Sequence, residues 1–335
     1  MRDLDPLIGE AWLTGLDCKI ATGLLAGKTL GAAWREMPAE WRGTRLATCD
    51  DFPILMKFIF PRDKLSIQVH PDDAYAAEHE RAAGGRGKTE MWHAVSAEPG
   101  AQVLVGLKPG ADKKKFLDAL NRGVLEELFL SHAVHSGDTF FIPAGIPHTI
   151  GPGMVLCEVQ EYSDLTYRVY DYGRVDANGR PRELHLGKAL DVTNFGSAPV
   201  GKTQALPLPA KLHERSLVAA CRYFATELLQ LGISQSHTTN SHFELLVILA
   251  GTGLFDGPGF AFPYRPGECW FLPADLDTYY LIAGAKFPAQ GGEHQQDPTA
   301  GPTTALRTYV PDLGFLRNAL LAAANSSALA RTVFD

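Results

Sequence analysis

Three polar side chains share one face of a short segment that reads as a β-strand. Residues 65–72 are Leu-Ser-Ile-Gln-Val-His-Pro-Asp, and apolar and polar residues alternate along them with a period of two. Ser66, Gln68 and His70 therefore point the same way, and we expect the opposite, apolar face to pack in a barrel core. Burying such polar groups without partners costs about 1–3 kcal/mol each. A metal ion with a bound polar substrate would give all three a partner.

A further candidate ligand ends a hairpin motif. Residues 137–148 have the form Gly, five residues, Pro, one residue, Gly, two residues, His. Glycines permit the tight turn and proline suits a strand edge, so we expect His148 to point into a barrel. The template returns at 267–278, with Asp275 in place of the second glycine and Thr278 in place of the histidine. The repeat predicts two related β-barrels, of which only the first keeps the histidine.

Taken together, these motifs resemble the metal site of type I phosphomannose isomerases of the short bacterial form, within the cupin superfamily. The resemblance extends from about residue 9 to residue 190, and weakly through the second predicted barrel. It rests on four short motifs: Gln68-x-His70, Gly87-Lys88-Thr89-Glu90, His148, and Asp164-Leu-Thr-Tyr-Arg168. That family is zinc-dependent and interconverts mannose 6-phosphate and fructose 6-phosphate. The resemblance implies zinc ligands at four positions, namely Gln68, His70, Glu90 and His148. Such an N/O ligand set suits zinc with an exchangeable position left for water or substrate.

The resemblance also implies the chemistry. Aldose–ketose isomerisation moves a proton between C1 and C2 through an enediol or enediolate, which requires a base and a positive environment for the oxyanion. Arg168 is a fixed cation suited to the enediolate, while Lys88 and Asp164 are the candidates for proton transfer, and the sequence leaves open which of them acts. For substrate binding, we expect Ser66 to contact a phosphate or hydroxyl group. Lys57 interrupts an apolar run and is expected to neutralise a phosphate.

Two rival functions remain open. A non-catalytic sugar-phosphate-binding cupin would keep the metal fold without turnover, and a zinc cupin isomerase could act on another sugar. The presence of Lys88, Asp164 and Arg168 favours catalysis. Gln68 stands where the general cupin pattern has its first histidine, which favours an isomerase over a dioxygenase. Four other histidines match nothing in the metal pattern: His79, His93, His132 and His135.

The elements that must position these residues are mainly strands. The fold prediction is mainly β, with two cupin-type jelly-roll barrels in tandem and a few helices inserted and at the C-terminus. Short apolar runs predict strands, and helical spacing predicts helices over 72–86, 111–130, 182–192 and 312–331. We predict a catalytic barrel over 1–193, with a helical insert near 111–130. A linker follows over 194–212. A second, metal-free cupin-like barrel with a C-terminal helix occupies 213–335.

The linker contains a misleading motif. Residues 196–203 satisfy the P-loop expression G-x4-G-K-[ST], but a phosphate-binding P-loop must open a helix. The residues that follow, Gln-Ala-Leu-Pro-Leu-Pro, cannot readily start one. We therefore assign this run to the linker and not to a nucleotide site.

Composition narrows the remaining choices. The 335 residues carry a net charge of −7, and no basic run is interleaved with aromatics, so we expect no nucleic acid partner. No stretch approaches the ~20 apolar residues that span a bilayer, and the N-terminus has no apolar signal-peptide core. The five cysteines are scattered without a CxxC pair, which predicts reduced thiols in a cytoplasmic protein. The expected partner is a small-molecule sugar phosphate, and the expected state is a monomer or homodimer.

Overall fold

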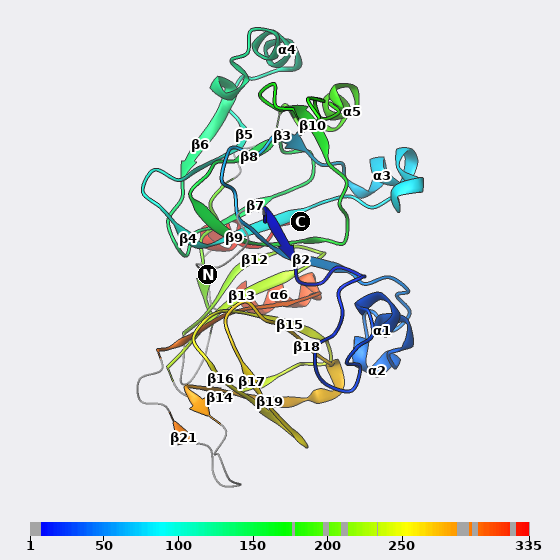
Figure 1. The fold of residues 1–335 in the computed structure, drawn as a ribbon, viewed down its shortest axis with the longest axis vertical. Helices are drawn as coiled ribbons and strands as arrows, with labels where there is room; N and C mark the ends of the chain where they lie inside the picture. Colours follow the sequence, from blue (N-terminus) through cyan, green and yellow to red (C-terminus); the bar gives the residue numbers. More distant parts are fainter. Residues whose placement is uncertain are drawn as a thin grey trace. The chain divides into compact units, whose positions relative to one another are not determined.

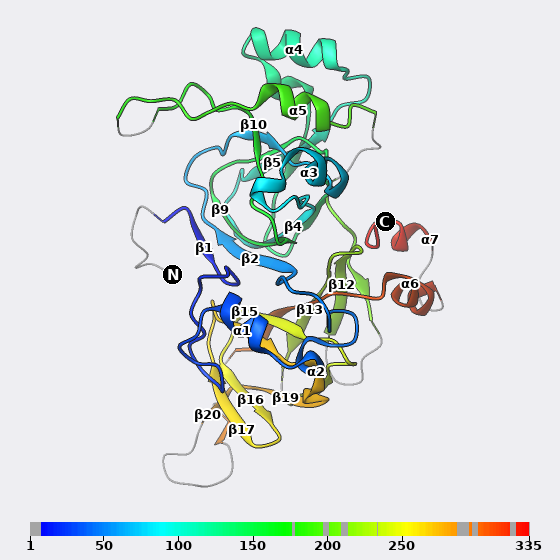
Figure 2. The same cartoon turned by 90° about the vertical axis from the view of Figure 1, so that its right-hand side faces the viewer.

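The chain forms two compact units of mainly antiparallel strands (Figures 1 and 2). Unit 1 is Met1–Trp12 with Ile54–Thr203, and unit 2 is Leu13–Pro53 with Gln204–Asp335. The computed structural model describes residues 8–175, 178–196, 201–208, 214–232, 234–286, 295–296, 301–321 and 326–334. Within these ranges, no helix is both long and apolar enough to cross a membrane. None of the five cysteines, all of which lie in these ranges, forms a disulfide.

Unit 1 contains two five-stranded sheets. In the first sheet, the strand order is β1 (Glu10–Trp12), β2 (Ile54–Ile59), β9 (Met154–Glu161), β4 (Glu90–Ala97) and β7 (Thr139–Ile142). In the second, the order is β10 (Tyr167–Tyr170), β3 (Ile67–Val69), β8 (His148–Ile150), β5 (Gln102–Leu107) and β6 (Phe129–Ala133). One apolar cluster draws Trp92 and Phe140 from the first sheet and Val103 and Ile150 from the second, so the two sheets share a core.

The other face of the second sheet is covered by helices. Ile67 and Val69 of β3 pack with Phe116 of α4 (Lys113–Asn121) and Ala189 of α5 (Leu186–Val192), and both helices lie at the same end of unit 1 in Figures 1 and 2. The alternation predicted for β3 is therefore present. Its apolar face, however, packs under these helices and not in the core cluster between the sheets, because helical segments cover that side of the sheet.

The predicted helices of unit 1 are shorter in the structure. The 72–86 segment forms α3 (Asp73–His79) and a 3₁₀ turn, η1 (Arg81–Ala83). The 111–130 segment contains α4 and a second turn, η2 (Leu125–Leu128), and it ends where β6 begins. Asp72 and Asp112 accept hydrogen bonds from the backbone N–H groups of the first turns of α3 and α4, so side-chain caps fix where both helices begin.

Unit 2 has two main sheets as well. The larger sheet has the order β11 (Leu206–Pro207), β12 (Glu214–Ala220), β13 (Ala225–Leu231), β22 (Thr303–Tyr309), β15 (Glu244–Ala250) and β18 (Cys269–Leu272). The smaller has the order β14 (Ser234–Thr238), β19 (Thr278–Ala283), β16 (Gly253–Gly257) and β17 (Phe260–Tyr264), and a two-stranded ribbon joins β20 (Ala285–Lys286) to β21 (Gln295–Gln296). The short helices are α1 (Leu30–Glu36), α2 (Ala39–Arg42), η3 (Ala274–Leu276), α6 (Leu313–Leu321) and α7 (Ser326–Leu329).

The mainly β prediction is confirmed, while closure of the sheets into two jelly-roll barrels stays a prediction, because the described strand pairings leave each sheet open. The compact units differ from the predicted domains at two places. Residues 13–53 group with unit 2, where Trp34 of α1 packs edge-on against Phe52 and Phe243. The start of the predicted linker groups with unit 1, where Thr203 N–H donates to the Thr139 carbonyl at 2.8 Å.

The run that mimics a P-loop lies at this boundary, and residues 197–200 fall outside the described part of the chain. Lys202 Nζ pairs with Asp138 at 2.6 Å, so its charge is already neutralised by a carboxylate of unit 1.

Candidate active site

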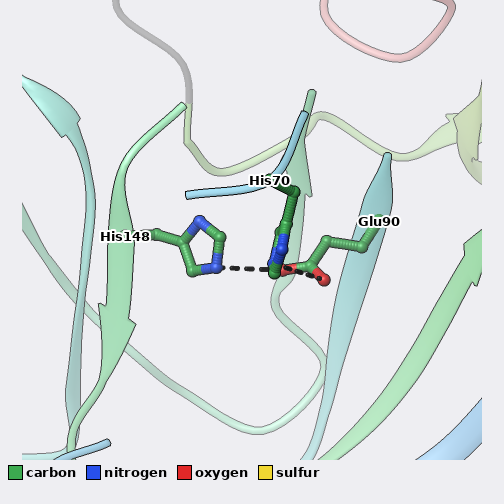
Figure 3. A group of neighbouring side chains, drawn as sticks. All are labelled: His70, Glu90 and His148. Carbon is green, nitrogen blue, oxygen red and sulfur yellow. Dashed lines mark ion pairs between the residues drawn. The ribbon is translucent and has the colours of Figure 1, made fainter. Parts of the chain in front are cut away.

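His70, directly after β3, Glu90 on β4 and His148 on β8 converge in the interior of unit 1 (Figure 3). His148 Nε2 lies 3.3 Å from Glu90 Oε1, and His70 Nε2 lies 3.5 Å from Glu90 Oε2. All three side chains are buried, with at most 1% of their surface exposed. His70 Nε2 has no hydrogen-bond partner among the described residues. A buried group of this kind calls for a ligand that is not part of the chain.

The tautomers of both imidazoles are fixed by backbone carbonyls. His70 Nδ1 lies 2.7 Å from the carbonyl oxygen of Leu165, and His148 Nδ1 lies 2.9 Å from that of Ile146. A carbonyl oxygen only accepts, so each Nδ1 carries the proton and each Nε2 presents a lone pair toward Glu90. Burial also lowers the pKa of both imidazoles, that of His148 to about 4, which keeps the lone pairs free at neutral pH.

The donor atoms of the three side chains lie within 4.8 Å of one another, close enough to hold one small cation. For metal–ligand distances of about 2.0–2.1 Å, ligand atoms at two corners of a tetrahedron are about 3.3–3.4 Å apart. Each imidazole Nε2 lies near this distance from one carboxylate oxygen, that of His148 at 3.3 Å from Oε1 and that of His70 at 3.5 Å from Oε2. Gln68 adds a fourth group, since its side-chain amide lies 3.2 Å from His148 Nε2. The two amide atoms can be exchanged by rotation, which would bring the oxygen to this position.

The backbone explains why these ligands meet. Gln68 and His148 are direct cross-strand partners on β3 and β8, so their side chains share one face of the sheet. Gly145, the second glycine of the hairpin motif, donates its N–H to the His70 carbonyl at 2.8 Å. Its φ is +83°, and a Cβ at this position would lie 2.9 Å from the Val192 carbonyl oxygen, so only glycine fits. The motif thereby ties the hairpin of one ligand to the strand of another.

A buried lysine, Lys88, contacts the glutamate of this group. Lys88 is buried, and its Nζ lies 2.9 Å from Glu90 Oε2. Burial raises the pKa of the Glu90 carboxyl to about 8, although Lys88 lowers it and the nearby Glu158 raises it further. A carboxyl in this environment is stabilised by a proton or a cation. The group therefore has the electrostatics of a cation site, as well as its geometry.

Glu158 lies beside this group and is ionised. Its Oε1 accepts from Trp92 Nε1 at 2.9 Å, and its Oε2 lies 3.2 Å from Lys57 Nζ. Burial raises the pKa of Glu158, but Lys88 and Lys57 more than offset that effect and leave it at about 2. The Trp92 ring also packs edge-on against His148, with centroids 5.3 Å apart. The same indole therefore contacts both Glu158 and His148.

The sequence of this chain is similar to those of known mannose-6-phosphate isomerases. No protein-family model matches the chain. Mannose-6-phosphate isomerase ManA of Bacillus subtilis (strain 168) is 33% identical over 280 residues, which are 82% of this chain and 86% of the relative. The mannose-6-phosphate isomerase of Streptococcus mutans is 35% identical over 68% of this chain and 70% of its own length.

The chain belongs to the mannose-6-phosphate isomerase family. The fold agrees, because the crystal structure of the mannose 6-phosphate isomerase from Bacillus subtilis matches with a TM-score of 0.78 over 90% of this chain and 89% of that one, at 27% identity. The resemblance inferred from the short motifs is confirmed at the level of the family.

The structure brings together most of the residues that the sequence singles out for this family. Glu90, His70, His148, Gln68 and Lys88 form one group. Ser66 is buried one residue before β3, next to this group in the chain.

Arg168 lies at the edge of the group. It is the cross-strand partner of Gln68 on β10, and its Nη1 donates to the Glu183 carbonyl at 3.0 Å. Burial lowers the pKa of Arg168, and the positive charge of Arg182 lowers it further.

Two predicted roles receive less support. Lys57 is surrounded by carboxylates: Glu158 at 3.2 Å, Glu10 at 3.3 Å and Asp164 at 3.7 Å. Its pKa is raised because, although burial favours the neutral amine, these carboxylates favour the charged form more strongly. A lysine neutralised in this way is poorly placed to attract a phosphate. Asp164 is 62% exposed and its carboxylate pairs with Lys57, so solvent reaches this carboxylate, whereas His70, Glu90 and His148 are buried.

Glu158, Trp92 and Glu161 are residues that the sequence reasoning missed as parts of the site. The signal for Glu158 was present, since a charged residue occurs within the otherwise apolar run Met154–Val159. Its partner Lys57 interrupts another apolar run on the neighbouring strand, and the two are paired in register. Two opposite charges in adjacent buried strands predict a pair, once the strand order is known.

Glu161 and Asp73 hold the segment that carries Lys88. Thr89 N–H donates to Glu161 Oε1 at 2.7 Å, and Gly87 N–H donates to Asp73 Oδ1 at 3.0 Å. Between them, Lys88 N–H donates to the Pro71 carbonyl at 3.0 Å. A Cβ at position 87 would lie 2.6 Å from the backbone of Asp72, so the close approach requires glycine. Lys88 is thereby fixed on both sides by carboxyl groups.

Glu161 should make stability depend on pH. Burial, with Asp73 second, raises its pKa from 4.5 to about 8. Between these values, the folded state binds more protons than the unfolded state, so this group's contribution to stability falls as pH rises and levels off above about pH 8. Replacing Glu161 by Gln keeps an acceptor for Thr89 and removes this dependence.

The relevant measurement is urea unfolding of both proteins from pH 5 to 9. The free energy of unfolding of the Gln variant should gain on the wild type as pH rises, by at most about 1.4 kcal/mol per pH unit. Parallel pH curves for the two proteins would show that Glu161 titrates normally.

Proposed function

We propose that this chain is a zinc-dependent aldose–ketose isomerase that interconverts mannose 6-phosphate and fructose 6-phosphate through an enediol or enediolate. The observation that carries the proposal is the buried group of His70, Glu90 and His148, with both imidazole lone pairs facing the carboxylate. Membership of the family supplies the reaction and the substrate class.

The ligand roles follow from the donor set. His70, Glu90 and His148 would hold the zinc ion, and Gln68 would add its amide oxygen. When bound, zinc would polarise or orient sugar oxygens as a Lewis acid. Nitrogen and oxygen donors without thiolate suit a catalytic site more than a closed structural one.

The remaining roles belong to charged side chains around this group. Arg168 would stabilise the oxyanion of the enediolate as a permanent cation. Ser66 would contact a substrate hydroxyl or phosphate. For proton transfer, Glu158 joins Lys88 and Asp164 as a candidate, and we favour Glu158 over Asp164. Glu158 is buried beside the metal-binding residues, whereas Asp164 is largely exposed.

The rival functions differ in what they turn over. A sugar-phosphate-binding protein would bind mannose 6-phosphate without producing fructose 6-phosphate, and an isomerase of other specificity would prefer another sugar. The buried Lys88, 2.9 Å from the ligand Glu90, supports an enzyme, because burying a lysine and a carboxylate has a large desolvation cost that simple binding would not require. The cytoplasmic location and the monomeric or dimeric state remain predictions.

A side-by-side assay tests the proposal. The zinc-loaded protein is incubated with mannose 6-phosphate, glucose 6-phosphate and unphosphorylated mannose, and ketose formation is followed with a coupled assay. We expect mannose 6-phosphate to give the highest kcat/KM. Binding without turnover would favour the sugar-phosphate-binding protein, and a better sugar substrate would reassign the specificity.

Replacing Arg168 by Ala tests the oxyanion role. We expect zinc content and unfolding temperature to stay close to wild type, while kcat falls about 10²–10³-fold, as on removal of one oxyanion-stabilising donor. Arg122, an exposed arginine at the end of α4, provides the control, and its alanine variant should keep full turnover. Near-normal kcat in the Arg168 variant would remove this residue from the catalytic set.

A further inference from the structure

Unit 2 repeats the strand register of unit 1 around the metal-binding glutamate. In unit 1, Glu90 on β4 pairs with Ile142 on β7, and in unit 2, Glu244 on β15 pairs with Leu272 on β18. Ile142 and Leu272 occupy the same position of the repeated hairpin template, immediately before its proline. Glu244 is therefore the counterpart of Glu90, and it is likewise fully buried.

The same register continues across the neighbouring strands. Trp92 on β4 pairs with Glu158, and its counterpart Leu246 on β15 pairs with Arg307. Across the next strand, the cross-strand partners are Glu158 with Lys57 in unit 1 and Arg307 with Glu227 in unit 2. Two residues further along, Ile59 pairs with Glu10, and Leu229 pairs with Arg215.

The charges at these matched positions are inverted. Unit 1 has the row Glu10, Lys57 and Glu158, and unit 2 has the row Arg215, Glu227 and Arg307. Each row is joined by ion pairs: Lys57 Nζ lies within 3.3 Å of its two carboxylates, and Glu227 lies within 3.2 Å of its two guanidinium groups.

The inversion changes the charge that lies beside Glu90 in unit 1 and beside its counterpart Glu244 in unit 2. In unit 1, the residue at this position is the acidic Glu158, which lies beside the acidic Glu90 and raises its pKa further. In unit 2, the Arg307 guanidinium contacts both Glu227 and Glu244 through ion pairs. Its Nη2 also donates to the carbonyl of Thr238 at 2.9 Å, and Thr238 is the register counterpart of the ligand Gln68.

Two tyrosines also bond to the carboxylates that contact Arg307. Tyr279 Oη donates to Glu244 at 2.7 Å, and Tyr309 Oη donates to Glu227 at 3.0 Å. Burial raises the pKa of Glu227, but Arg307 and Arg215 more than offset this and bring it to about 2. Arg307 is only 2% exposed, so its charge is balanced by these internal partners.

We propose that Arg307 is a built-in cation at the position of unit 2 that corresponds to the metal site of unit 1, so that unit 2 is stabilised by a guanidinium ion where unit 1 takes a metal. The two units of the repeat therefore differ: unit 1 needs an external cation, and unit 2 supplies one from its own side chain. The inference concerns unit 2 and does not depend on the sugar that unit 1 converts.

Replacing Arg307 by Ala tests the proposal by chemical rescue. The variant removes the guanidinium partner of buried Glu244 and one of the two guanidinium partners of buried Glu227, and we expect the unfolding temperature to fall on the order of 10 °C. The lost atoms correspond to ethylguanidinium, so millimolar ethylguanidinium should raise the unfolding temperature of this variant and leave the wild type unchanged. Ethylammonium, which lacks the planar fork, should restore less. The exposed Arg265 of the same unit gives a control whose alanine variant should respond to neither compound.

A second pair of variants keeps the test decisive if the alanine protein fails to fold. Lys and Met have similar length and differ in charge, so Arg307→Lys should be more stable than Arg307→Met. Equal stability of that pair, or of the alanine variant and wild type, would overturn the proposal. Metal analysis gives an independent readout: zinc-loaded wild type should hold one equivalent and His148→Ala none. A second equivalent that persists in His148→Ala would place a metal in unit 2 and contradict the assignment.

Discussion

Replacing His148 by Ala should remove the metal and the activity together. His148 contributes one of two imidazole lone pairs to the group and is fully buried, so water cannot readily take its place. Loss of an outer-shell partner already lowers metal affinity by about 10–100-fold, and loss of a ligand should lower it by more than about 100-fold. Glu90→Ala should behave in the same way. Zinc content after gel filtration, measured by atomic spectroscopy, and kcat on mannose 6-phosphate check both expectations.

His93 provides the matched control. It is also buried, it lies on the same strand as Glu90, and burial lowers its pKa to about 4. It bonds to Thr139, however, and takes no part in the group of His70, Glu90 and His148. His93→Ala should therefore lose stability through its cavity while keeping zinc and most of the turnover. Full zinc and full turnover in His148→Ala would refute the ligand assignment, and loss of zinc in both histidine variants would indicate a general packing effect.

The meeting of His70, Glu90 and His148 could be predicted from the sequence because most of these residues lie in short, local patterns. Alternation placed Gln68 and His70 on one face, and the hairpin template placed His148 at a turn that only glycine can make. Glu90 came from the family motif and not from any periodicity. These signals depend on residues a few positions apart, and the structure brings both histidines within 3.5 Å of the glutamate.

The parts that could not be predicted depend on strand order. Lys57 looked like a phosphate ligand because an isolated lysine in an apolar run has no visible partner in the sequence. Its partner Glu158 lies about a hundred residues later, and β2 and β9 become neighbours only in the folded sheet. The grouping of residues 13–53 with unit 2 likewise depends on the packing of Trp34 against Phe243. These two residues are far apart in the sequence, so no local pattern predicts their contact.

Replacing Glu158 by Gln should reduce turnover strongly while zinc is retained. The amide oxygen can still accept from Trp92, and the side chain keeps its volume, so the indole beside His148 should stay in place. What disappears is the buried negative charge and its ability to accept a proton. General acid–base groups contribute about 10²–10⁴-fold, and kcat should fall within that range. Solvent proton exchange at C2 of the substrate, followed by NMR, should fall in parallel if Glu158 transfers the proton.

Glu10→Gln makes the same chemical change on the other side of the same lysine. Glu10 is about half exposed and lies 3.3 Å from Lys57 Nζ, whereas Glu158 is almost fully buried. If Glu158 acted only by pairing with Lys57, the two variants would lose similar activity. We expect the Glu10 variant to lose less than about 10-fold, below the range for a proton-transfer group. Equal losses would make Glu158 a partner that positions Lys57, and would return proton transfer to Lys88 or Asp164.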